Sequence, residues 1–182
     1  MTSRFSRSAS AFAAEIDRYL GEWFDRRLVY TPADLRSRSR LPALIDVVRR
    51  AGWPRIDELK GRFVFCLSGT EAWKRRYAEL ASATSLCFAD FDVADDRSYE
   101  QLAPTLPRDR VFLNMHVFSA DFGTWQASVP RLAKNGYIVR AYVLDAKGIW
   151  DKALSAGVQV LSTDKVRGKT WARVGAEPFA SL

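Results

Sequence analysis

The spacing of apolar residues divides the chain near residue 60 into a helical part and a part in which strands and helices alternate. Before that point, apolar side chains recur at helical spacing from Ser10 to about Arg27 and from Leu41 to Arg50, which predicts two amphipathic helices. Thr31 followed by Pro32 is typical of a helix start, because threonine caps free amide groups and proline suits the first turn. Residues 1–60 are therefore expected to be mostly helical.

From residue 61 to 166, apolar runs alternate with segments of helical spacing. The runs show no alternation of period two, which indicates strands covered on both faces, as in parallel sheets. The expected strands are Arg62–Leu67, Ser85–Asp90, Val111–Met115, Gly136–Asp145 and Gly157–Asp164, and the expected helices between them are Thr70–Ala81, Ser98–Leu102, Trp125–Lys134 and a short one carrying Trp150. This order predicts an α/β chain with about five parallel strands. Ligands bind beyond the carboxyl ends of such strands, so a site is expected at that rim.

The composition fits one globular domain over residues 1–182, in which residues 167–182 form a tail. Of the 182 residues, 48% are hydrophobic and 27% are charged, which argues against a disordered chain. The formal net charge of +7 would attract phosphate-bearing partners such as lipid headgroups, phosphodiesters or nucleic acid, and the alternative is a surface that is merely basic and soluble. Nucleic acid is less favoured, because no aromatic residues interleave the Arg36–Arg40 stretch. We see no signal peptide or transmembrane segment in the sequence and expect a cytoplasmic protein.

Cysteine and histidine are scarce. Cys66 and Cys87 lie in apolar runs without the spacing of a zinc motif, so we expect buried thiols, although adjacent strands could bring them within reach of a disulfide. His116 is the only histidine. A single histidine just after a strand is more often structural than catalytic.

Four phrases of the sequence resemble one known family. They are Thr31–Leu35, Gly52–Gly61, Ile138–Asp145 and Gly157–Asp164. In this order they are similar to the calcium-dependent phosphatidylinositol-specific phospholipase C-like proteins of the PLC-like phosphodiesterase superfamily, with a likeness from about residue 15 to residue 166. Those proteins are TIM barrels, and the resemblance implies that this chain corresponds to their last five strands. The expected fold is therefore a partial or rearranged TIM-like barrel with N-terminal helices.

The resemblance implies a phosphoric diester hydrolase that lacks part of its machinery. The family's His-Asn pair, Glu-x-Asp metal pair and second histidine lie on strands without a counterpart here, and one histidine cannot supply an acid and a base. We expect a PLC-like phosphodiesterase relative that is not active alone or, alternatively, a non-catalytic protein that binds a phosphorylated ligand or a partner protein. Five strands cannot close an eight-stranded barrel. Either the N-terminal helices cover one opening, or another copy or a separate N-terminal half completes the sheet.

Two aspartates form the candidate metal site. Asp90 and Asp92 are two residues apart at the predicted end of a strand, so their side chains share one face. Carboxylate oxygens are ligands for Ca²⁺ or Mg²⁺, and the family resemblance implies Ca²⁺. The alternative is an acidic loop that caps the next element.

Four further residues form the candidate ligand site. Arg140 lies in the middle of an apolar strand, where its charge requires either a phosphate-bearing ligand or an ion pair with Asp145, Asp164 or Asp90. Asp145 and Asp164 end their predicted strands, where they bind ligand or cap the following turn. Asn114 sits in an apolar strand and needs a hydrogen-bond partner, either a ligand or a neighbouring strand.

Overall fold

A computed structural model describes residues 9–80, 84–118, 122–168 and 170–171. Five strands form one sheet: β1 (Phe65–Leu67), β2 (Cys87–Ala94), β3 (Phe112–His116), β4 (Ile138–Tyr142) and β5 (Val160–Leu161). Neighbouring strands are parallel and follow one another in chain order, as successive strands of a barrel do. The predicted α/β class and partial barrel are therefore confirmed.

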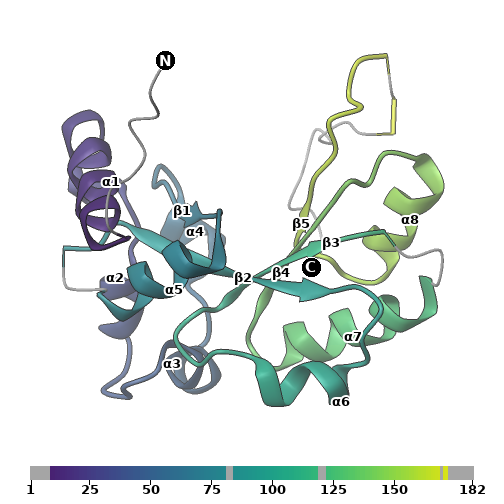
Figure 1. The fold of residues 1–182 in the computed structure, drawn as a ribbon, viewed down its shortest axis with the longest axis horizontal. Coiled ribbons are helices and arrows are strands. Elements are labelled where there is room, and N and C mark those ends of the chain that lie inside the picture. The colour runs from purple at the N-terminus through teal and green to yellow at the C-terminus, as the bar shows by residue number, and fades with distance from the viewer. Residues whose placement is uncertain (1–8, 81–83, 119–121, 169, 172–182) are drawn as a thin grey trace.

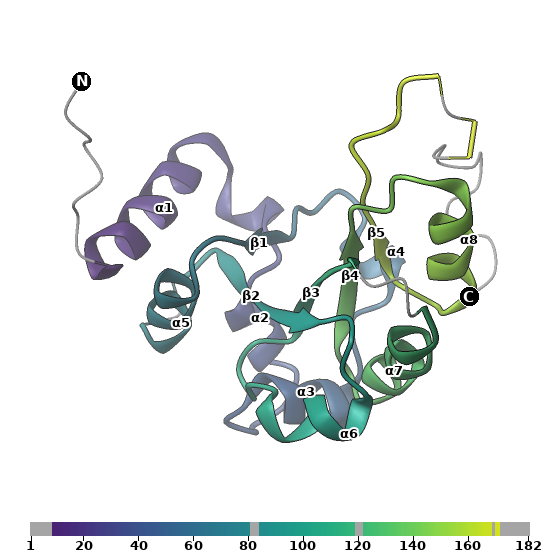
Figure 2. The same cartoon turned by 45° about the vertical axis from the view of Figure 1, so that its right-hand side comes forward.

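Helices connect the strands and surround the sheet (Figures 1 and 2). The N-terminal part contains α1 (Ala9–Trp23), η1 (Arg26–Leu28), α2 (Pro32–Arg36), α3 (Leu44–Ala51) and α4 (Ile56–Leu59). The connections contain α5 (Glu71–Glu79), α6 (Tyr99–Leu102), η2 (Ala103–Thr105), α7 (Phe122–Lys134) and α8 (Lys147–Ser155). Of the described helices, none is long and apolar enough to cross a membrane. Most of the predicted tail lies outside the described residues.

Several element boundaries differ from the sequence prediction. β2 continues past Asp90 to Ala94, so Asp90 and Asp92 lie inside a strand and not at its end. β4 stops at Tyr142, three residues before Asp145. It stops because Val143 has a φ of 65°, a left-handed conformation that is incompatible with a strand. The predicted start of α2 is confirmed, because Thr31 and Asp34 form a reciprocal capping box.

The two faces of the sheet are buried by different parts of the chain. We call the face packed against α7 the outer face, where Leu113, Val139 and Trp125 belong to one fully buried cluster. The opposite, inner face carries Phe88 and Phe112, whose rings have centroids 5.2 Å apart. Aromatic residues of the N-terminal part fill this end of the inner face.

Tyr30 and Trp53 are the N-terminal residues that fill it. The ring centroids of both lie 6.3 Å from Phe88, and Trp53 lies 5.4 Å from Phe112. Trp53 Nε1 also donates a hydrogen bond to the carbonyl oxygen of Gly136, over 2.9 Å. The N-terminal part thus covers the inner face where the strands begin, one of the arrangements expected from sequence.

Gly136, the turn residue before β4, is required by this packing. Its φ is +92°, and a Cβ atom placed there would lie 2.9 Å from Cγ1 of Val48 in α3. Any other residue would therefore strain the backbone and push α3 away from the sheet.

The two cysteines are free thiols. In the register of β1 and β2, Cys66 lies opposite Phe88 and Cys87 lies opposite Phe65. Paired residues of adjacent strands point to the same face of a sheet, and the next residue along points to the opposite face. Cys66 and Cys87 are one residue out of register, so their side chains lie on opposite faces and do not form a disulfide. Cys87 is buried, as expected, whereas Cys66 is exposed.

We predict that Phe88→Ala lowers the free energy of unfolding by about 3–5 kcal/mol, because it removes the ring that Tyr30, Trp53 and Phe112 surround. Urea unfolding followed by circular dichroism measures the change. Leu154→Ala is the matched control, since Leu154 is 54% exposed and its truncation should cost less than about 0.5 kcal/mol. Equal effects of the two substitutions would contradict the proposed packing.

Candidate ligand site on the inner face

A line of polar side chains crosses the inner face from β1 to β5. Its members are joined by hydrogen bonds and are Ser68, Lys74, Asp90, Asp92, Asn114, Arg140 and Ser162, which we call the inner-face network. Strand register explains the line, because Asp92 lies opposite Asn114 and Asn114 lies opposite Arg140. Alternate residues of a strand point to one face, so these polar groups continue the face that Phe88 and Phe112 begin.

Lys74 is the centre of the acidic end of this network. It lies in α5 with its side chain 1% exposed, and its Nζ atom lies 2.8 Å from Asp90 Oδ1 and 2.5 Å from Asp92 Oδ2. Asp90 also accepts a hydrogen bond from the hydroxyl of Ser68. A buried ammonium group is stable only when carboxylates neutralise it, and these contacts meet that need.

The electrostatics of the pair follow from this geometry. Burial by itself lowers the pKa of Lys74, but its hydrogen bonds to Asp90 and Asp92 outweigh burial and raise the pKa above its usual value. Burial raises the pKa of Asp92, but the hydrogen bonds from Lys74 and Asn114 outweigh it and lower the pKa. Both groups therefore stay charged over a wider pH range than they would in water.

Arg110 supports the same end of the network from outside the line. Its Nε atom donates to the carbonyl oxygen of Asp90 over 2.8 Å, and its Nη1 atom lies 2.5 Å from Glu71 Oε1. The hydrogen bond from Arg110 holds the pKa of Glu71 below its usual value. This contact ties the first turn of α5 to β2.

The two aspartates predicted to bind a metal ion instead form ion pairs with the lysine of α5. Lys74 lies between the two carboxylates, and the described residues contain no group of three or more His, Cys, Asp or Glu side chains that could hold a metal ion. Ca²⁺ prefers six to eight oxygen ligands. The donor set at Asp90 and Asp92 does not fit a calcium ion, and the metal site stays a prediction without structural support.

The basic end of the network is different. Arg140 Nη1 donates to Asn114 Oδ1 over 2.7 Å, and Arg140 Nε donates to Ser162 Oγ over 2.9 Å. Within the part of the chain that the structure describes, Arg140 forms no ion pair and its Nη2 group has no hydrogen-bond partner. The ion pair with Asp145, Asp164 or Asp90 that the sequence left open does not form there.

A cavity of about 240 Å³ lies beside this arginine. It is lined by Arg140, Tyr142, Val143, Ser162, Thr163 and Asp164. The Arg140 guanidinium lies 5.0 Å from the centre of the Tyr142 ring, and the Tyr142 ring stacks on His116 at 4.5 Å. Hydroxyl, carboxylate and aromatic groups thus surround Arg140, and no carboxylate of the described residues contacts its guanidinium.

A residue with a strained backbone conformation borders this cavity. Val143 has a φ of 65°, and β-branched residues rarely adopt positive φ because of steric clashes. Such strain costs about 1–3 kcal/mol and concentrates at functional sites. It directs the chain after β4 past Ser162, whose carbonyl oxygen accepts a hydrogen bond from the Leu144 amide.

The structure brings most of the predicted ligand residues together. Asn114 contacts Arg140, and Asp164 lines the same cavity. Asp145 does not line the cavity but accepts a 2.8 Å hydrogen bond from Thr163, which does. No cap of a following helix is formed by Asp145, because the residue before α8 is Ala146.

Sequence analysis missed Lys74, Ser68, Ser162 and Val143. Lys74 carried a usable signal, because it lies three residues before the buried Tyr77 and therefore on the buried face of its helix. The conformation of Val143 has no signal in the sequence.

We predict that Lys74→Met lowers the free energy of unfolding by about 3–5 kcal/mol, because it leaves the buried Asp90 carboxylate without its cation. Chemical denaturation measures the loss. Lys147→Met is the control, because Lys147 pairs with Asp151 on the exposed surface, where ion pairs contribute at most about 1 kcal/mol. A loss no larger than the control's would show that the network is not a stabilising ion pair.

The same network predicts how this loss depends on pH. The lowered pKa of Asp92 gives stability that is present above the unfolded carboxyl pKa of about 4 and is lost as pH falls. The raised pKa of Lys74 gives stability that is complete below the unfolded lysine pKa of about 10.4 and is lost as pH rises. The gap in unfolding free energy between wild type and Lys74→Met should be widest between these limits. A gap that does not change with pH would contradict this assignment.

Comparisons with known proteins show the fold of this chain but assign it to no family. No protein-family model matches the chain, and no curated protein matches it in sequence. Among solved structures, the chain is similar to the Ca²⁺-dependent phosphatidylinositol-specific phospholipase C of Streptomyces antibioticus, with a TM-score of 0.61 and 19% sequence identity over 91% of this chain. The match spans 60% of that enzyme's length. At this identity the likeness shows the fold alone: this chain has a PLC-like fold that corresponds to about three fifths of the solved enzyme.

Proposed function

We propose that this chain is a PLC-like phosphodiesterase relative that binds a phosphorylated polyol at the Arg140 cavity and does not hydrolyse phosphodiesters alone. The observation that carries the proposal is the guanidinium of Arg140, which lines a cavity and forms no ion pair with a described carboxylate. Phosphate oxygens suit a guanidinium, because it donates charge-assisted hydrogen bonds in a fixed planar geometry. The net charge of +7 acts in the same direction at longer range.

The other groups of the cavity determine the rest of the ligand. Ser162 accepts from Arg140 and so has a hydroxyl hydrogen that can be donated to a further phosphate oxygen, while Asp164 supplies a carboxylate that accepts hydrogen bonds. A carboxylate repels a bare phosphate but accepts from the hydroxyls of a sugar or cyclitol. A phosphate carried by a polyol ring therefore matches the cavity better than inorganic phosphate does.

The proposal that the chain is not active alone rests on the acid–base groups. Internal attack on a phosphodiester needs one group to remove a proton and another to protonate the leaving oxygen. The chain has one histidine, His116, whose ring lies against Phe118 and Tyr142. The strongest alternative cation, Lys74, is bound to two carboxylates and has a raised pKa, which makes it a poor general acid or base at neutral pH.

We predict that Arg140→Gln weakens binding of inositol 1-phosphate by about tenfold or more, because a hydrogen bond to a charged group contributes about 1.5–3 kcal/mol. Isothermal titration calorimetry with inositol 1-phosphate measures the change. Arg131→Gln is the control, because Arg131 pairs with Glu100 on the exposed surface and has no place in the cavity. If the two variants bind inositol 1-phosphate equally well, Arg140 does not contact the ligand.

The catalytic part of the proposal has its own test. The purified chain is incubated with phosphatidylinositol vesicles, with and without Ca²⁺, and release of inositol phosphate is measured. We expect no release above the uncatalysed rate under either condition. Turnover that depends on the purified chain would overturn this part of the proposal and leave the binding site standing.

A further inference from the structure

Two cations and two carboxylates share the inner-face network. Lys74 and Arg140 lie toward its opposite ends, and Asp90 and Asp92 lie between them, in contact with Lys74. The formal charges of these four groups cancel. In the part of the chain that the structure describes, neither aspartate contacts Arg140. The availability of Arg140 to an anion therefore depends on how the network divides its charges.

One amide group separates Arg140 from the nearer carboxylate. Asn114 Nδ2 donates to Asp92 Oδ1 over 3.1 Å, and Asn114 Oδ1 accepts from Arg140 Nη1 over 2.7 Å. The three residues lie opposite one another on β2, β3 and β4. Adjacent strands are about 4.8 Å apart, and the side chains of an arginine and an aspartate together can span two such spacings. A direct contact between Arg140 and Asp92 thus lies within reach.

Asp92 is the carboxylate with room to change its partner. Its side chain is 55% exposed, whereas that of Asp90 is 4% exposed. The charge of Asp92 also reaches the ligand cavity, because burial raises the pKa of Tyr142 and the charge of Asp92 raises it further. Arg140 opposes this rise. The Asp92 carboxylate and the Arg140 guanidinium therefore act on the same aromatic ring.

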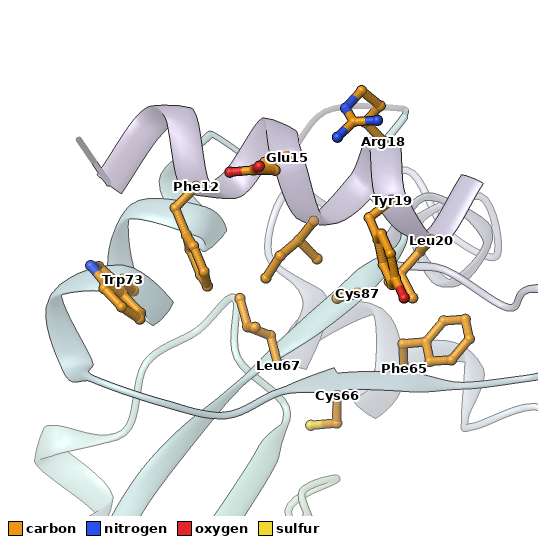
Figure 3. Close-up of a pocket in the computed structure, with 11 residues that line it drawn as sticks. Phe12, Glu15, Arg18, Tyr19, Leu20, Phe65, Cys66, Leu67, Trp73 and Cys87 are labelled. Carbon is orange, nitrogen blue, oxygen red and sulfur yellow. The ribbon is translucent and has the colours of Figure 1, made fainter. Parts of the chain in front are cut away.

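The surroundings of Asp92 offer no replacement for Lys74 other than Arg140. Among the described residues, Asp92 forms an ion pair only with Lys74. Arg110, the other cation near β2, directs both of its Nη atoms to the Glu71 carboxylate. On β1 the inner face carries Cys66, and Figure 3 shows its side chain on the side of β1 away from α1. A thiol supplies no positive charge, so Arg140 is the next cation along the network.

We infer that Lys74 keeps Arg140 available to an anionic ligand by holding Asp92, and that Lys74 is thus a positioning residue for a cavity it does not line. Without the ammonium group, Asp92 turns toward Arg140, because a guanidinium pairs more strongly with a carboxylate than with a neutral amide. A ligand then has to displace that carboxylate. This role rests on the proposed function, since it concerns the same arginine.

Calorimetric titration of the full chain with inositol 1-phosphate tests the inference. Lys74→Met should weaken binding at least about tenfold, because the ligand loses its charge-assisted hydrogen bonds to Arg140. Adding Asp92→Asn to Lys74→Met should restore most of the affinity, since the competing carboxylate is then gone. Leu102→Ala is the control, because it removes buried contacts on α6 but no charge, and it should bind like the wild type. Circular dichroism establishes that each variant is folded.

A second variant leaves the buried lysine in place. Asn114→Asp keeps the shape of the side chain and puts a carboxylate at the 2.7 Å contact with Arg140 Nη1. It should also weaken binding at least about tenfold. Asn135→Asp is the matched control, because it makes the same change after α7, where the Asn135 side chain bonds only the Arg131 carbonyl oxygen among the described residues.

Nitrogen NMR of the free chain separates this inference from the proposed function. The Nε–H signal of Arg140, assigned by its absence in Arg140→Gln, reports the partner of the guanidinium without any ligand. We expect the signal to shift in Lys74→Met and in Asn114→Asp, and to return when Asp92→Asn is added to Lys74→Met. These shifts in a chain that binds no inositol 1-phosphate would support the role of Lys74 and remove the proposed ligand. An unchanged signal and affinity in folded Lys74→Met or in Asn114→Asp would overturn the inference, as would a loss that Asp92→Asn does not restore.

Discussion

A lysine without access to water organises the inner face of this sheet. Lys74 reaches from α5 to Asp90 and Asp92 of β2, and its side chain is 1% exposed. An ammonium group in this position requires two things at once: carboxylates on the facing strand and a fixed distance between that strand and its helix. Arg110 and Glu71 maintain the distance. The alignment of α5 with β2 therefore depends on a charge balance as well as on apolar packing.

This balance makes the two ends of the polar line chemically different. At the acidic end, Asp90 and Asp92 form ion pairs with Lys74, which makes them a poor ligand set for a metal ion. At the basic end, Asn114 and Ser162 orient Arg140 without neutralising it. A guanidinium held by neutral partners keeps its attraction for an anion. The proposed ligand site therefore lies between β4 and β5, at the carboxyl rim of the sheet.

A sheet of five parallel strands leaves two edges and two openings to be covered. The N-terminal part covers one opening, because Tyr30 and Trp53 pack against the inner face where the strands begin. At the β1 edge, the described residues provide only an isolated bridge between Val29 and Phe63. The solved enzyme with the same fold is longer, and this chain spans 60% of it.

The sequence alone determined the fold class, because uninterrupted apolar runs and helical spacing follow from burial of each strand on two faces. It also selected Asn114, Arg140 and Asp164 as candidate ligand residues, because a polar residue in an apolar run, or at its end, is costly to bury, and the structure places the three close together. It could not decide which charges meet. That choice depends on strand register and on the depth of Lys74 in its helix, both of which are set by packing between distant segments. The end of β4 was equally hidden, because the positive φ of Val143 is imposed on the residue by the tertiary structure against its own preference.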